Sequence, residues 1–134
     1  MRPRRALPAL VLSAALALAE PADAAITANT FTPTGALRSG GHAAAVGIVI
    51  GCDTPGTFAV EVTVRQGTTG ATGSRHGRCT GTAETHRVVV HTRQTLTAGT
   101  AEACGEATTK TRGRVDDRRS WCRAGGITIE EVAP

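Results

Sequence analysis

The stretch Thr57–Gln66 carries a large apolar side chain at every second position. The apolar positions recur at every second residue: Phe58, Val60, Val62 and Val64. Successive side chains of a β-strand point to opposite faces, so this spacing predicts a strand with one buried face. Outside residues 6–19 the chain shows no apolar period of 3.6 residues, and we therefore expect an all-β domain without packed helices.

Further segments with strand character follow at regular spacing between turn residues. They cover residues 26–31 as an edge strand, 45–52, 75–82, 86–93, 99–111, 118–123 and 127–132. Residues 53–56 and 113–117 are expected to turn the chain, and residues 67–73 to form a flexible Gly/Thr loop. About seven short strands in a domain of this length predict an antiparallel β-sandwich that is immunoglobulin-like in broad architecture.

The first residues are typical of a secretory signal peptide. Three arginines within the first five residues precede an apolar stretch over residues 6–19, and the small-residue pattern Ala22-Asp23-Ala24 follows the break at Glu20-Pro21. We expect cleavage after Ala24, which divides the chain into a signal peptide over 1–24 and one secreted domain over 25–134. A transmembrane anchor, the alternative, requires about 20 apolar residues and so a longer stretch. Arg4-Arg5 alone does not complete a twin-arginine motif, which favours general export to the extracellular space.

Four cysteines remain in the expected mature domain: Cys52, Cys79, Cys104 and Cys122. An exported domain with few large apolar residues gains stability from disulfides. Four cysteines allow three pairings, and among them we favour Cys52–Cys79 and Cys104–Cys122, since each pair would then bracket neighbouring strands. A zinc site is the alternative, but the spacing contains no C-x-x-C pair and export favours oxidation, so no metal is expected.

Several stretches of the chain resemble known secreted proteins. Thr32-Pro33 followed by Gly40-Gly41 and a strand ending at Cys52 resembles the opening of many bacterial immunoglobulin-like domains. FAVEVTVRQG (58–67), GRCTGT (77–82) and the run from TRGRV (111–115) to WCR (121–123) are similar to a group of small uncharacterised secreted β-sandwich proteins of actinobacteria. The resemblance covers most of the expected mature domain. It implies fold and export, and it has no catalytic residues to transfer.

Basic residues gather between positions 110 and 123. Six lie in this segment, against the two acidic residues Asp116 and Asp117: Lys110, Arg112, Arg114, Arg118, Arg119 and Arg123. Alternation predicts that the first three share one face of a strand, with the others on the returning strand. Such a hairpin could bind an anionic surface polymer. In the alternative interpretation, the charges keep a sheet edge from pairing with other chains.

The sequence offers little support for catalysis or for a cofactor. The histidines (His42, His76, His86 and His91) form no H-x-H or H-E-x-x-H motif, and no serine lies in G-x-S-x-G. Ser74 and His76 are the nearest approach to a nucleophile–base pair. Adjacent carboxylates at Asp116-Asp117 and Glu130-Glu131 point apart on an extended chain, which disfavours an acid–base couple. With no tyrosine and one tryptophan, the chain also lacks the aromatic platform of a sugar-binding surface.

These observations favour a non-enzymatic, disulfide-stabilised secreted module with a binding or structural role. Its partner could be an anionic surface polymer or another protein; the net charge of +4 is too mild to predict nucleic acid, and no membrane span is expected. An enzyme is the alternative with the least support, and two further alternatives also belong to other classes. One is a secreted proteinase inhibitor, although its reactive-loop motifs are missing. The other is a small-ligand carrier similar to the apoproteins of chromoprotein antibiotics, which would need more apolar residues to line a cleft.

Overall fold

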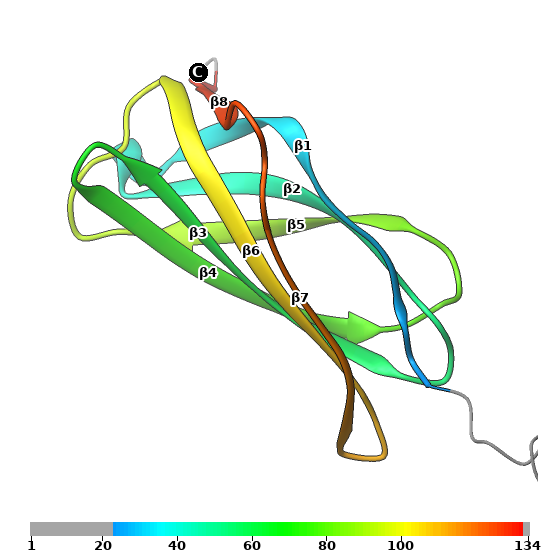
Figure 1. Ribbon diagram of the computed structural model, residues 1–134. Coiled ribbons are helices and arrows are strands. Elements are labelled where there is room, and N and C mark those ends of the chain that lie inside the picture. Colours follow the sequence, from blue (N-terminus) through cyan, green and yellow to red (C-terminus); the bar gives the residue numbers. More distant parts are fainter. Residues whose placement is uncertain (1–22, 133–134) are drawn as a thin grey trace, which may run out of the picture.

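The computed structural model describes residues 23–132, which form an all-β domain (Figure 1). The expected signal peptide therefore lies outside the described residues except for Asp23 and Ala24. The strands and one short 3-10 helix follow in chain order: β1 (Ile26–Arg38), η1 (Ser39–Gly41), β2 (Ala43–Cys52), β3 (Thr57–Gln66), β4 (Thr69–Arg78), β5 (Glu84–His91), β6 (Gly99–Thr111), β7 (Arg114–Cys122) and β8 (Ile127–Glu130).

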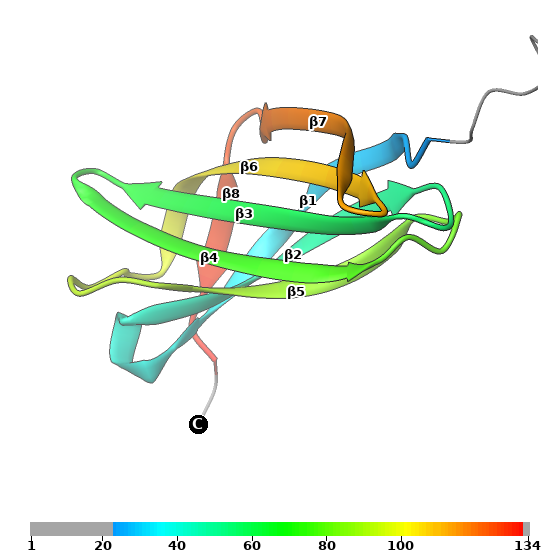
Figure 2. The same ribbon diagram turned by 90° about the horizontal axis from the view of Figure 1, so that it is seen from below.

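Seven of the strands close into a barrel, and β7 adds an eighth strand beside it. The strand order is β3-β4-β5-β2-β1-β8-β6-β7, and a further pairing of β3 with β6 closes the ring. The pairs are antiparallel except for β1 and β8, which run parallel through Thr34–Ala36 and Thr128–Glu130. Figure 2, seen from below, shows β3, β4 and β5 side by side and β1 and β2 crossing behind them.

This closure corrects the expected architecture. The all-β class is confirmed, but the strands close into a mixed barrel instead of forming a two-sheet antiparallel sandwich. The physical reason lies in β6, whose opposite edges pair with β3 and with β8. Sequence spacing indicates which segments are strands, and it does not indicate which distant segments pair.

The boundaries of several expected strands also change. The expected strands over Thr57–Gln66 and 99–111 are confirmed. The expected strand over 26–31 pairs with β2 alone, as an edge would, but β1 continues beyond it to Arg38, and Thr34–Ala36 also pair with β8. Residues 69–73 belong to β4 instead of a flexible loop, because Gly67-Thr68 alone makes the turn. The hairpin after β6 turns at Arg112-Gly113, where both residues have positive φ, and not over 113–117.

Large and small side chains alternate around the barrel interior. Phe58, Val62 and Val64 of β3 lie between small residues of β4 and β6, and Val60 is the exception, because Arg75 lies opposite it on β4. The matched positions include Val62 beside Gly73 and Gly105, and Phe58 beside Gly77. A Cβ atom added at Gly77 would lie 2.6 Å from the Phe58 ring, and one at Gly105 would lie 2.8 Å from the Trp121 ring. A chain poor in aromatic residues thus fills its core through close backbone approach.

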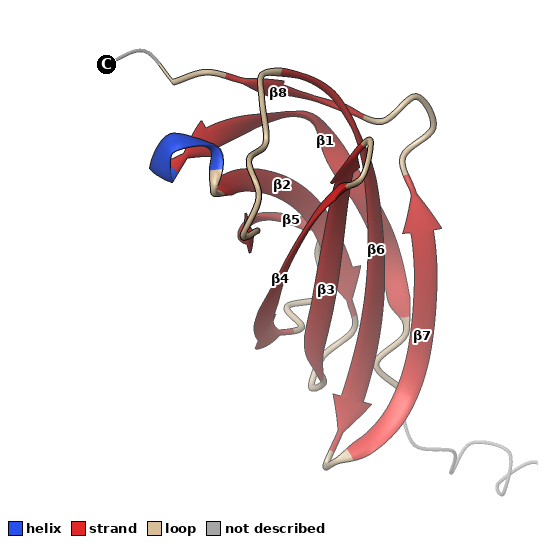
Figure 3. Ribbon diagram, turned by 90° about the vertical axis from the view of Figure 1, so that its left-hand side faces the viewer, coloured by secondary structure: helices blue, strands red, loops and turns tan. Residues whose placement is uncertain are grey.

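Both expected disulfides are confirmed. Cys104 and Cys122 lie directly opposite each other on β6 and β7. Cys52, at the end of β2, bonds to Cys79, just after β4. Those two strands are not neighbours, because β5 lies between them, so this bond joins strand ends across the barrel rim. Figure 3 shows the strand ends and the loops that connect them at both ends of the barrel.

Candidate functional site

Four neighbouring strands, β4, β3, β6 and β7, present a continuous outer face. At the end that carries the Arg112-Gly113 turn, two rows of aligned residues cross these strands. The first row is Arg78, Thr57, Lys110 and Val115; the second is His76, Ala59, Thr108 and Arg118. In the first row the basic side chains stand on β4 and β6, with Thr57 of β3 between them. In the second row they stand on β4 and β7, with small residues of β3 and β6 between them. We call His76, Arg78, Lys110 and Arg118 the basic face.

A shallow depression lies within the basic face. Its volume is about 510 Å³, and it is lined on β3 by Thr57 and Ala59, on β4 by His76 and Arg78, and on β6 by Thr108 and Lys110. All four residues of the basic face are exposed. Within residues 23–132, none of the four forms an ion pair; the arginines that do so are Arg114 and Arg119. Cationic groups and threonine hydroxyls around one depression are the donors that a phosphate or sulfate group requires.

The six basic residues singled out from the sequence do not gather at one place. Lys110 and Arg118 belong to the basic face, and Arg112 lies at the hairpin turn at the same end. Arg114 and Arg119 point to the opposite side of the sheet, where they pair with Asp116 and Asp117. Arg123 lies at the far end of β7, and its Nε donates to the Gly126 carbonyl at 3.0 Å. The prediction that Lys110, Arg112 and Arg114 share a face is therefore wrong, since the turn interrupts the alternation.

Sequence reasoning missed two members of the basic face, His76 and Arg78. They lie on β4, far from the 110–123 segment in sequence, and β3 alone brings them close by pairing with both β4 and β6. One sequence feature could have revealed them: His76 and Arg78 are two residues apart, so on a strand they share a face, and they follow the clearly predicted strand Thr57–Gln66. This feature would have indicated a basic face on a β3–β4 hairpin. The hairpin was not predicted, because residues 69–73 were expected to be a loop.

An acidic row borders the basic face. Glu61 of β3 lies directly opposite Glu106 of β6, and the Ser120 hydroxyl lies 3.4 Å from Glu106 Oε2. Like charges directly opposite on neighbouring strands repel each other. The acidic row therefore limits the positive surface to the end of the sheet that carries the Arg112-Gly113 turn.

Replacing Glu61 by threonine is expected to raise the free energy of unfolding by about 0.5–1 kcal/mol, because the substitution removes this repulsion and places a β-branched residue on a strand. Urea denaturation followed by Trp121 fluorescence measures the change. Glu102→Thr on β6, opposite Arg65, is the matched control and should give no gain. Equal effects at the two positions would contradict the repulsion.

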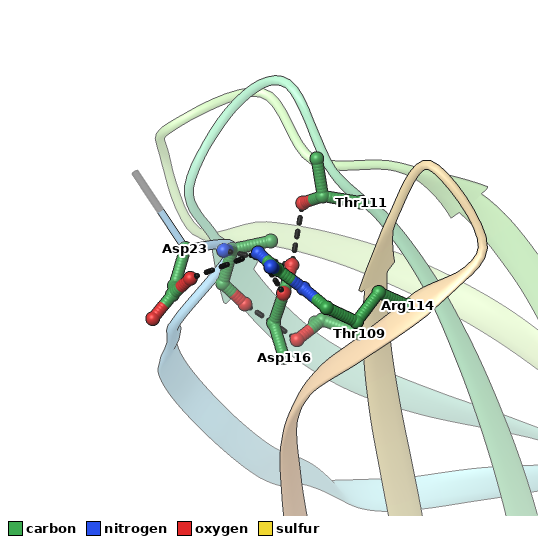
Figure 4. Close-up of polar contacts among 6 residues, drawn as sticks. Asp23, Thr109, Thr111, Arg114 and Asp116 are labelled. Atoms are coloured by element: carbon green, nitrogen blue, oxygen red, sulfur yellow. Dashed lines mark hydrogen bonds and ion pairs between the residues drawn. The ribbon is translucent and has the colours of Figure 1, made fainter. Parts of the chain in front are cut away.

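A second cluster binds the start of the described chain to the β6–β7 hairpin (Figure 4). The Ala24 N–H donates to Asp116 Oδ2 at 3.1 Å, and the Ile26 N–H donates to Asp117 Oδ2 at 3.0 Å. The Thr109 hydroxyl donates to the Ala24 carbonyl, and the Thr111 hydroxyl donates to Asp116. Arg114 lies 3.4 Å from Asp23 and 3.5 Å from Asp116. We call these contacts the N-terminal anchor.

A β-bulge explains why the adjacent residues Asp116 and Asp117 both direct their carboxylates toward the start of β1. The register of β6 and β7 shifts between Thr109 and Lys110, which pair with Asp117 and Val115, so Asp116 is the extra residue. A bulge redirects the side chain of the inserted residue. Both carboxylates consequently accept N–H groups near the start of β1, although adjacent residues of a regular strand would point apart. The two carboxylates replace the backbone ladder that β7 does not form with this part of β1.

These contacts lower the pKa of both carboxyl groups. The Thr111 hydroxyl contributes most to the lowered pKa of Asp116, and the Ala24 N–H and Arg114 add to it, against the opposing effect of desolvation. The Ile26 N–H contributes most to the lowered pKa of Asp117, followed among the lowering effects by the Arg118 N–H and Arg119. Hydrogen bonds to the charged form thus outweigh burial at both positions.

The remaining candidate residues are dispersed. His42 Nδ1 lies 2.7 Å from the Gln94 carbonyl, and the His86 ring packs 5.0 Å from the Phe58 ring. Ser74 and His76 are both exposed on β4, and no hydrogen bond joins them among the described residues. Over residues 23–132 no three His, Cys, Asp or Glu side chains gather as a metal site. In the same range, no helix has the length and apolar character to cross a membrane.

Comparison with known proteins does not assign the chain to a family. No protein-family model matches it, and no curated protein matches it at a significant level. The function has to be inferred from the surface just described.

Proposed function

We propose that this chain is a secreted, non-enzymatic binding module, and that its basic face binds an anionic polymer bearing phosphate or sulfate groups. The observation that carries the proposal is the basic face itself: His76, Arg78 and Lys110 line the 510 Å³ depression, and Arg118 lies beside it, opposite Thr108. None of the four forms the kind of ion pair that holds Arg114 and Arg119 within the described residues. A repeating polyanion suits a cluster of separate charges, since each contact contributes modestly and several act together.

The architecture around the basic face supports a rigid binding surface. All four residues lie on strands, and the central strand β3 is paired on both edges from Thr57 to Arg65. The Cys104–Cys122 disulfide joins β6 to β7 within the same four-strand face. Such a surface loses little conformational entropy when a ligand binds. Two disulfides also fit a protein that works outside the cytoplasm.

Replacing Arg78, Lys110 and Arg118 together by glutamine is expected to weaken binding to heparin and to polyphosphate by about 10- to 50-fold at low salt, since each exposed contact is worth about 0.5–0.8 kcal/mol. Binding of the parent should fall as salt rises. Affinity for the two polymers is measured by titration calorimetry. A preference for one of them identifies the sulfate or the phosphate as the recognised group.

The matched control removes the same number of charges elsewhere. Arg38, Arg65 and Arg93 are exposed and lie outside the basic face, so their joint replacement by glutamine should change affinity by less than about threefold. Equal losses in the two triple variants would mean that net charge alone drives binding, which would refute a defined site. Unchanged affinity in the first variant, with more self-association, would favour the edge-protection interpretation.

A further inference from the structure

The chain at Ala24 is bound through both of its backbone polar groups. Its N–H donates to Asp116, whose side chain is 1% exposed, and its carbonyl accepts from the Thr109 hydroxyl. The next residue continues the attachment, because the Ala25 carbonyl accepts the Asp53 N–H at 3.1 Å. Ala24 is thus held by the hairpin before β1 begins.

The Ala24 side chain belongs to the core. Ala24 is 0% exposed, and a Cβ added at Gly56 would lie 2.2 Å from the Ala24 Cβ. Thr109 is also 0% exposed and is the one buried polar residue of the described range. Without the Ala24 carbonyl, its hydroxyl would lose the acceptor that it has in this structure. A buried donor without an acceptor is strongly destabilising.

A chain that begins at Ala25 would therefore lack part of its own core, the buried hydrogen bond from Thr109 to the Ala24 carbonyl, and the part-buried bond from the Ala24 N–H to Asp116. The sequence holds a second small-residue pattern at Ala17-Leu18-Ala19, where the apolar stretch ends. This pattern also meets the A-x-A requirement of a signal-peptide cleavage site. Cleavage there leaves Asp23 and Ala24 in the domain.

We infer that the leader is removed after Ala19, so that the secreted chain begins at Glu20, and Asp23 and Ala24 belong to the folded domain. A leader peptidase hydrolyses the Ala19–Glu20 bond; water adds across it, giving a carboxylate on Ala19 and an amine on Glu20. The cleavage site thus differs from the one after Ala24 that the sequence alone favours. The inference does not depend on what the basic face binds.

Mass spectrometry of the full chain, secreted from a bacterial host, identifies the first residue of the product. We expect Glu20, and any other start overturns the inference. Two matched substitutions test the choice of bond. Ala19→Phe should abolish the product that begins at Glu20, whereas Ala22→Phe should leave it unchanged, because the A-x-A pattern requires small residues at the first and third positions before the bond that is cut. The reverse pattern points to cleavage after Ala24.

A stability measurement tests the physical basis separately. Residues 20–134 and 25–134 are produced with these defined first residues, and we expect the shorter chain to melt about 10 °C lower or not to fold. Asp116→Asn should lower the Tm of the longer chain more than that of the shorter one, because the Ala24 N–H is its partner only in the longer chain. Equal melting temperatures of the two parent chains would overturn the inference.

Discussion

Replacing Cys52 and Cys79 together by alanine is expected to lower the free energy of unfolding by about 3–4 kcal/mol. This is the stabilisation that the loss of chain entropy in the unfolded state gives for two bonded cysteines that are 27 residues apart. The location adds a local effect. β4 and β5 share the single backbone pair Thr72–His91, and farther along the strands the Arg75 guanidinium reaches the Arg87 carbonyl at 3.0 Å. We call the contact between β4 and β5 the β4–β5 seam. The Cys52–Cys79 disulfide lies at the end of β4 that is far from the Thr72–His91 pair, where the seam has few backbone hydrogen bonds. Urea denaturation measures the loss of stability.

The second disulfide supplies the control. Cys104→Ala with Cys122→Ala should cost a similar amount, about 3 kcal/mol for a separation of 18 residues. Hydrogen exchange distinguishes the two variants, because β6 and β7 stay joined by their backbone ladder and the Arg112-Gly113 turn. Faster exchange at residues 75–79 is expected only without Cys52–Cys79. Equal exchange in both variants would contradict a special role at the β4–β5 seam.

Asp116→Asn is expected to lower Tm at pH 7 by about 5–10 °C, because an amide cannot accept from all of the donors that surround this carboxylate. Asp116 accepts from the Ala24 N–H, the Thr111 hydroxyl and Arg114. Asparagine keeps one oxygen and directs an NH₂ group toward one of these donors. Thermal unfolding of the domain that retains Ala24, measured across a range of pH, gives the size of the effect.

The loss of Tm caused by Asp116→Asn should become smaller as the pH falls. The folded-state pKa of Asp116 lies below its ordinary value of 3.8, so the ionised group stabilises the fold above that value. This stabilisation is lost as the pH falls through the folded-state pKa. The difference in Tm between parent and variant should thus be constant near neutrality and shrink below about pH 4. Glu84→Gln, at an exposed carboxylate, is the control; an Asp116→Asn difference that persists at pH 2 would contradict this assignment.

The sequence predicted the positions of strands better than it predicted which strands pair with each other. The alternation in Thr57–Gln66 and the long segment 99–111 matched β3 and β6, and the cysteine pairing was confirmed. Barrel closure was missed because it depends on β3–β6 and β1–β8 pairs between distant segments. The first part of β4 was missed for a different reason. Its inward residues include Ala71 and Gly73, which carry no strand preference but leave room beside the larger residues of β3.

The residues of the candidate site also fall into two groups, those that the sequence revealed and those that only strand pairing brings together. Lys110 and Arg118 were found because they lie in a basic segment, whereas His76 and Arg78 reach them only through the register of β3. The orientation of Arg114 was mistaken because a two-residue turn and a bulge both interrupt the alternation within a few residues. Nothing in the sequence pointed to the N-terminal anchor, whose partners Ala24 and Asp116 are 92 residues apart.

The position of β8 has a consequence for the order of folding. This four-residue strand follows all the others in sequence, yet it lies between β1 and β6 and pairs with both. A chain that emerges from a ribosome or a translocation pore with its N-terminus first makes β8 available last. Until then β1 and β6 keep unpaired edges, and the ring cannot close. The late, long-range closure predicts that folding is slow and is completed only after the whole domain has emerged.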